Sequence, residues 1–142
     1  MTTLTKGSRF SPLVKPAITR EQLKSYAEAS LDNNLIHLDD DVAKKAGLPG
    51  VIAHGMLTMA FFGEFLHQAL GEAGGGRVGE LSCRFKAMVF PGDVVTVNGT
   101  VRDAHVPDGA ERLGTVHCDL DARNQKGDVT ATGHATLILG SA

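Results

Sequence analysis

Five residues in the first half of the chain carry groups suited to proton transfer and carbonyl binding: Asp32, Asn34, His37, His54 and Gly55. A carboxylate accepts a proton, and an imidazole donates or accepts one near neutral pH. If Gly55 begins a helix, the free backbone N–H groups there suit the oxygen of a polarised carbonyl. Together these groups could add water to a double bond conjugated to a thioester. Spacing alone also fits a loop in which Asp32 only caps a turn.

A helix over about residues 20–30 is expected to lead into the two reactive side chains. Thr19 is a good N-cap for it, and Gln22 completes a capping box. A loop over residues 31–38 follows, so the carboxylate and the imidazole are both expected on irregular backbone. The inward stripe of the helix is predicted to consist of Leu23, Tyr26 and Ala27.

The loop is followed by signals for a second, short helix. The run Asp39–Asp41 complements the positive end of its dipole, which we interpret as helix-end electrostatics rather than a metal cluster. Lys44 and Lys45 lie near its C-terminal end. Gly47 then caps this helix and Pro49 stops it.

The rest of the chain predicts one apolar helix and one antiparallel sheet. Residues 55–70 are apolar on nearly every face, so this helix should be buried on all sides, although it is too short to cross a bilayer. Apolar residues then alternate with polar ones, as in sheet strands, over segments 81–89, 95–102, 115–123 and 129–139. A helix and a sheet of this kind bury their surfaces against each other. The sequence therefore predicts an α+β hot-dog fold, an antiparallel sheet wrapped around a long central helix, as a single domain over residues 1–142.

Shorter segments complete this outline. Residues 10–18 could form a strand only at a sheet edge, because Pro12 and Pro16 interrupt them. Gly74–Gly76 is expected to be a flexible connector, and Pro107-Asp108-Gly109 a turn between strands.

The composition excludes several classes of protein. The chain has 142 residues and a formal net charge of −2, which gives no reason to expect a nucleic-acid or membrane partner. Residues 1–10 contain no apolar signal-peptide region, so the cytoplasm is the default location. Cys83 and Cys118 lack zinc-site spacing and are expected to be buried free thiols. No histidine pair has the spacing of a metal site, so no metal is predicted.

Two motifs resemble the MaoC-like family, which includes the (R)-specific enoyl-CoA hydratases and the β subunit of the mycobacterial (3R)-hydroxyacyl-ACP dehydratase. The stretches that carry the resemblance are residues 26–37, followed by Ala43, and residues 50–58, which read Gly-Val-Ile-Ala-His-Gly-Met-Leu-Thr. Leu31 stands where the family has glycine, and Leu35 where it has proline. The matching motif positions are Ser30, Asp32, Asn34, Ile36, His37 and Ala43.

The resemblance implies reversible, R-specific hydration of trans-2-enoyl thioesters of CoA or acyl carrier protein (ACP), with no metal or organic cofactor. Asp32 and His37 would be the catalytic pair that holds the water, with Asp32 favoured as base and His37 as acid. Asn34 and Gly55 would be the substrate-binding residues: Asn34 would fix the loop and could also hold the water, and the Gly55 N–H would bind the thioester oxygen. The resemblance also implies a homodimer, or a heterodimer with a second hot-dog subunit, in which this chain is the catalytic member.

Two other functions are consistent with the sequence. Leu31 and Leu35 are the only support for an acyl-CoA-binding protein without turnover. A thioesterase would need a carboxylate on the long helix, and Glu64 is the candidate. His54 is expected to fix the entrance of that helix by a hydrogen bond, and the remaining histidines to be solvated.

Overall fold

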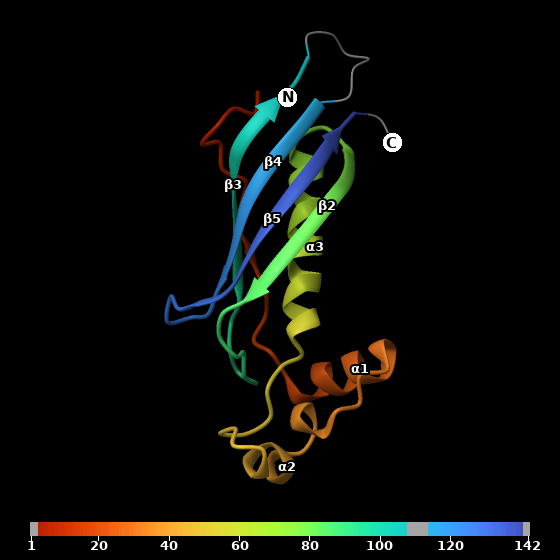
Figure 1. The fold of residues 1–142 in the computed structure, drawn as a ribbon, viewed down its shortest axis with the longest axis vertical. Coiled ribbons are helices and arrows are strands. Elements are labelled where there is room, and N and C mark those ends of the chain that lie inside the picture. Colours follow the sequence, from red (N-terminus) through yellow and green to blue (C-terminus); the bar gives the residue numbers. More distant parts are fainter. Residues whose placement is uncertain (1–2, 108–113, 141–142) are drawn as a thin grey trace.

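One long helix lies against a curved sheet in the computed structural model, which describes residues 3–107 and 114–140 (Figure 1). The turn predicted at Pro107-Asp108-Gly109 therefore falls, except for Pro107, outside the described residues. Within these residues, none of the helices combines the length and the apolar character that a membrane crossing requires. The elements in chain order are β1 (Leu13–Val14), α1 (Arg20–Ser30), the 3-10 helix η1 (Leu35–His37), α2 (Asp40–Lys45), α3 (Gly55–Glu72), β2 (Gly76–Phe85), β3 (Thr96–His105), β4 (Gly114–Arg123) and β5 (Val129–Leu139).

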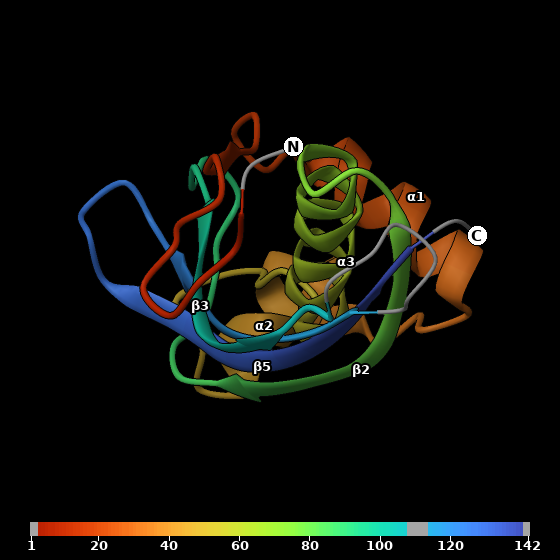
Figure 2. The same cartoon turned by 90° about the horizontal axis from the view of Figure 1, so that it is seen from above.

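The strands form one antiparallel sheet in the order β1-β3-β4-β5-β2. Buried and more exposed residues alternate along β4, as expected for a sheet with one apolar face. Figure 2 shows the sheet curling around one side of α3, and Figure 1 shows α1 and α2 at one end of the molecule. The predicted α+β hot-dog fold is confirmed, and the short β1 pairs with β3 at the sheet edge, as the two prolines required.

Two glycines allow α3 to approach the sheet closely. A Cβ atom on Gly99 of β3 would lie 2.5 Å from Cε1 of Phe65, and one on Gly133 of β5 would lie 3.4 Å from Cε2 of Phe62. Both phenylalanines are completely buried in the core. The Phe65 ring therefore occupies the space that a side chain at position 99 would fill. The Phe62 ring rests in ordinary contact with Gly133, where a Cβ atom would lie 2.7 Å from the backbone oxygen of Ser82.

The prediction that α3 is buried on all sides is wrong. Met56 is 56% exposed and Ala60 is also exposed, whereas Leu66 of the same helix is completely buried. The sheet curls around only one side of the helix (Figure 2). Apolar side chains that no other described element covers remain exposed to solvent in the single chain. The apolar composition of a helix therefore does not by itself establish that every face is buried.

The predicted bounds of the first long strand are also wrong. This strand, β2, covers Gly76–Phe85 rather than 81–89, and it begins inside the glycine run that was expected to be a connector. A Cβ atom on Gly76 would lie 2.3 Å from the carbonyl oxygen of Ile138, so only glycine fits this close pairing with β5. Phe85 was expected to face inward, but it is half exposed at the end of the strand.

The two cysteines differ from each other in burial. Both are free, Cys118 is buried, and Cys83 is only half-buried, so the prediction of two buried thiols holds for Cys118 alone. Burial raises the pKa of the Cys118 thiol to about 11. Cys118 is therefore an inert core residue at neutral pH.

Candidate active site

The loop that carries the predicted catalytic pair begins with a left-handed residue. Thr19 caps α1 as predicted, because its Oγ1 accepts a hydrogen bond from the Gln22 backbone N–H at 3.0 Å. At the other end of α1, Leu31 has φ 62° and ψ 16°. Among the described residues it is the only non-glycine residue with positive φ. The backbone thus keeps the conformation that glycine favours, although this chain has leucine there.

Asp32 and Asn34 shape the loop through hydrogen bonds to its backbone. Oδ1 of Asp32 accepts from the Asn34 N–H at 3.3 Å, and Oδ1 of Asn34 accepts from the Ile36 N–H at 3.2 Å. Asn34 therefore caps η1, which agrees with its predicted role in fixing the loop. Asp32 is exposed, so its carboxylate remains accessible to solvent and to a bound molecule.

His37 is the last residue of η1, and only 8% of it is exposed. Its Nδ1 lies 2.7 Å from the carbonyl oxygen of Ile52. Since a carbonyl oxygen can only accept, Nδ1 carries the proton in this contact. Nε2 is then the atom of His37 that can exchange a proton with another molecule.

The ring of His54 lies directly against the ring of His37. The two centroids are 3.9 Å apart with an interplanar angle of 26°, and Tyr26 of α1 contacts His54 from another side with centroids 4.8 Å apart. Nε2 of His54 donates to the backbone carbonyl of Asp32 at 3.1 Å. Burial lowers the pKa of His54. Asp32, His37 and His54 each place one side-chain atom, a carboxylate oxygen or a ring nitrogen, within 4.8 Å of the other two. The structure therefore brings the predicted pair together and adds His54 as a third residue.

The sequence predicted that His54 fixes the entrance of α3 by a hydrogen bond. His54 does make a hydrogen bond, but to Asp32 in the loop, and its side chain does not cap α3. Its contact with His37 is not visible in the sequence. The only sequence signal that could have suggested it is the position of His54 next to Gly55 in the second motif.

The three grouped side chains also have the chemistry of a metal site, since two imidazoles and a carboxylate can bind a transition metal. Nitrogen lone pairs lie in the plane of each imidazole ring. In two stacked rings they run side by side and do not converge on the single point that a tetrahedral ion requires. The observed arrangement suits proton transfer better than metal binding.

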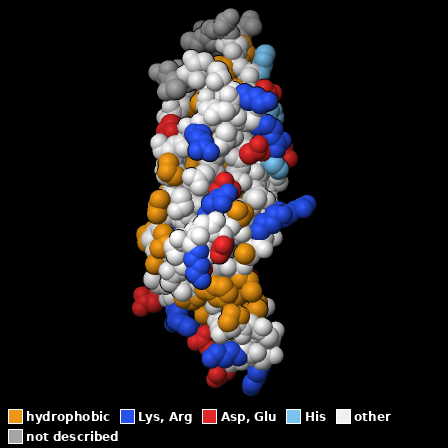
Figure 3. Space-filling view, turned by 90° about the vertical axis from the view of Figure 1, so that its left-hand side faces the viewer, with side chains coloured by type: hydrophobic (Ala, Val, Ile, Leu, Met, Phe, Trp, Pro, Cys, Tyr) orange, Lys and Arg blue, Asp and Glu red, His pale blue; other side chains and the backbone are white. Residues whose placement is uncertain are grey.

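An apolar pocket of about 310 Å³ adjoins Gly55 at the start of α3. The ring of Phe85 lies so close that a Cβ atom on Gly55 would be 3.0 Å from it. Figure 3 shows hydrophobic side chains gathered toward the helical end of the molecule, and Phe85 and Met88 of the pocket wall are each about half exposed. The wall includes Ile52, Ala53, Gly55, Thr58, Phe85 and Met88.

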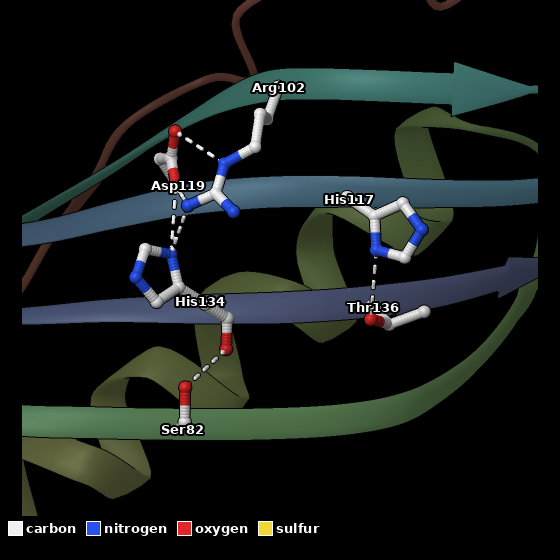
Figure 4. A network of polar contacts seen from close by, with 6 residues as sticks. All are labelled: Ser82, Arg102, His117, Asp119, His134 and Thr136. Carbon is white, nitrogen blue, oxygen red and sulfur yellow. Dashed lines mark hydrogen bonds and ion pairs between the residues drawn. The ribbon is translucent and has the colours of Figure 1, made fainter.

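A second aspartate–histidine pair lies on the outer face of the sheet (Figure 4). Nδ1 of His134 lies 2.8 Å from Oδ1 of Asp119 and 2.7 Å from the Arg102 guanidinium, and Arg102 also pairs with the Asp119 carboxylate. The Arg102 guanidinium holds the pKa of Asp119 below its usual value. Both side chains of the pair are about half exposed or more. This pair joins neighbouring strands at the surface and lies away from the apolar pocket, so we do not assign the chemistry to it.

Replacing Leu31 by glycine is expected to stabilise the protein by up to about 1 kcal/mol. A left-handed L-residue costs roughly 1–2 kcal/mol, and the greater freedom of unfolded glycine offsets roughly 0.5–1 kcal/mol of the gain. Urea unfolding measures the change. Leu35→Gly is the matched control, because Leu35 is exposed on the same loop without positive φ, and this variant should lose stability. Equal or lower stability of Leu31→Gly would contradict the strain at this position.

Comparisons with known proteins show which sequences and structures this chain resembles. A family model described as "MaoC like domain" matches residues 5–122. The chain is 36% identical over 134 residues to an (R)-specific enoyl-CoA hydratase of Rhodospirillum rubrum, covering 94% of this chain and 88% of that protein. The solved (R)-hydratase from A. caviae involved in PHA biosynthesis superposes with a TM-score of 0.80 at 28% identity, over 98% of this chain and 99% of the other.

Other matches cover only a small part of much longer proteins. The chain spans 5% or less of the length of several fungal fatty acid synthase subunits. One of them is the fatty acid synthase beta subunit TOXC of Cochliobolus carbonum, which is 30% identical over 115 residues, or 81% of this chain.

Proposed function

This chain belongs to the MaoC-like domain family, and from that membership we propose that it is a hydro-lyase that adds water reversibly to trans-2-enoyl thioesters and forms (3R)-hydroxyacyl thioesters. The observation that carries the proposal is the proximity of Asp32 and His37 on a loop beside the start of α3. The thioester carrier would be CoA or ACP.

In the proposed reaction, a water molecule lies between the Asp32 carboxylate and Nε2 of His37. Asp32 takes a proton from the water as its oxygen bonds to the β-carbon. His37, protonated on Nε2 as well as on Nδ1 for this step, delivers the Nε2 proton to the α-carbon. The proton held by Asp32 then returns to Nε2 of His37 before the next turnover. The two residues can also share both duties, because both side chains would contact the same water molecule. The bond from Nδ1 of His37 to the Ile52 carbonyl supports this assignment, because it leaves Nε2 toward the substrate.

The N-terminus of α3 would stabilise the negative charge that develops on the thioester oxygen. The first N–H groups of a helix have no acceptor within the helix, and Gly55 is the first residue of α3. A single oxyanion donor of this kind contributes about 2.7–4 kcal/mol to the transition state. The apolar pocket beside Gly55 could then hold the first part of the acyl chain.

Glu64, the residue on which a thioesterase would depend, is already engaged elsewhere. Its Oε2 lies 2.7 Å from Nζ of Lys15, which belongs to the N-terminal segment. This ion pair argues against Glu64 as a nucleophile or base. Leu31 gives little support for a protein without turnover, because the backbone keeps its left-handed conformation there.

We further propose that the protein is a dimer of hot-dog subunits, as identical chains or with a second type of subunit. Strand β2 lies at the sheet edge, with backbone groups free for pairing on one side, and most of its residues are exposed. Pairing two such edges would extend the sheet across both subunits. The cytoplasm is the proposed location, which fits two free cysteines.

Purified protein mixed with crotonyl-CoA, longer enoyl-CoA esters or the same acyl groups on ACP is expected to remove the conjugated absorbance of the substrate. Chiral analysis should identify the (3R)-hydroxyacyl product, and an assay for free thiol should remain negative. Release of thiol would instead indicate a thioesterase. Binding of every substrate without loss of absorbance would indicate a protein without turnover, and either result would refute the proposal.

A further inference from the structure

His54 contacts both members of the proposed catalytic pair from inside the protein. Only 1% of the residue is exposed. Its ring stacks on His37, and its Nε2–H donates to the backbone carbonyl of Asp32. Tyr26 of α1 packs against the remaining side of the ring. A single buried side chain thus links the loop, η1 and the start of α3.

We propose that His54 is a positioning residue for the hydration reaction. Its Nε2–H fixes the Asp32 backbone, and its ring supports the His37 ring by stacking on it. The inference rests on the proposed function. It assigns to His54 no contact with the substrate and no proton transfer of its own.

The hydrogen bonds of His54 indicate that it acts as a neutral ring. Its Nδ1 is buried without a hydrogen-bond partner among the described residues. A proton on this atom would have no acceptor, which is costly in a buried position. The groups that face the ring are Asp32 from the loop, His37 from η1 and Tyr26 from α1.

Two stacked imidazoles 3.9 Å apart are unfavourable when both are charged. Burial disfavours the charged form of His54 and lowers its pKa, with the His37 charge acting in the same direction. Burial therefore favours the neutral form of His54. The proposed arrangement gives the reaction one imidazole that transfers a proton and one that remains a fixed support.

A role in packing alone would not explain the residue type. An apolar ring of similar size could fill the same volume without leaving a buried nitrogen unsatisfied, which costs about 1–3 kcal/mol. The feature that only a donor provides is the bond to the Asp32 carbonyl. Removing the donor while keeping an aromatic ring should separate the two roles.

The test compares His54→Phe, which keeps the ring without the donor, with His54→Gln, whose side-chain amide can donate from about the position of Nε2. His54→Phe is expected to lower kcat for hydration about 10- to 100-fold, because small misplacements of reacting groups have effects of this size. KM should change little.

His54→Gln should recover most of the kcat that His54→Phe loses. The control is His67→Gln, at an exposed position of α3, which should behave like the unchanged protein. Full activity of His54→Phe, or equal loss in both His54 variants with intact folding, would overturn the inference.

Nitrogen-15 NMR of the histidine rings tests the same inference without relying on activity. His54 is expected to carry its proton on Nε2 and to titrate with a midpoint below 6.5. His37 should carry a proton on Nδ1. A proton on Nδ1 of neutral His54 would overturn the positioning role even if hydration is observed. If the unchanged protein hydrates no enoyl thioester, the proposed function fails, while the NMR result still reports on the contacts of His54.

Discussion

Asp32→Asn and His37→Asn are each expected to lower kcat/KM for enoyl thioester hydration by about 10²- to 10⁴-fold, the range typical of a general acid or base. Both changes remove a proton-transfer group while preserving the local structure. Asparagine at position 32 keeps an oxygen for the Asn34 N–H, and asparagine at position 37 keeps a donor for the Ile52 carbonyl. The loss should be read from the decay of the conjugated absorbance at saturating and limiting substrate.

The double variant should be little worse than the more damaged single variant, because groups that act as a unit are not additive. Asp41→Asn and His67→Asn are matched controls at exposed positions outside the site, and both should retain full activity. Unfolding in urea checks that all five variants are folded. The catalytic assignment is falsified if either Asp32→Asn or His37→Asn keeps more than about a tenth of the original kcat/KM.

The second large effect concerns the contact that holds α3 against the sheet. Phe65→Ala is expected to lower the free energy of unfolding by about 3–5 kcal/mol, as for other buried phenylalanines. The Phe65 side chain is completely buried, and its ring packs edge-on against Phe10 with centroids 6.3 Å apart. Urea unfolding monitored by circular dichroism measures the loss.

Gly99→Ala tests the same contact from the sheet. Its Cβ would lie 2.5 Å from the Phe65 ring, so this overpacked variant should lose about 1–3 kcal/mol. Combining Gly99→Ala with Phe65→Leu should cost less than the sum of the single changes, since the smaller side chain leaves room for the new methyl group. Gly63→Ala is the control, because nothing lies within 4 Å of its added Cβ. It should be neutral or slightly stabilising in the helix. Strict additivity of Gly99→Ala and Phe65→Leu would contradict a direct contact between positions 99 and 65.

The sequence by itself was enough to predict the fold class and the residues of the proposed catalytic pair. The fold class could be predicted from local periodicity: apolar residues alternate along β4 and β5 and predominate in α3. In a strand or helix, the position of a residue in the repeat determines the face on which its side chain lies. The two motifs that resemble the MaoC-like family indicated Asp32 and His37, and their short separation in the chain allows a compact loop to bring them together. The extent of one domain over residues 1–142 stays a prediction.

Contacts between segments that are distant in the chain were decided only by the tertiary structure. The Ile52 carbonyl that orients His37 and the stacking of His54 on the same ring depend on the path of the chain between η1 and α3. The exposure of Met56 and the start of β2 at Gly76 depend on how far the sheet curls and on the close approach of β5. Periodicity identifies which face of a helix or strand is apolar. It does not identify the element that covers this face, because that is decided by packing between segments that are far apart in the sequence.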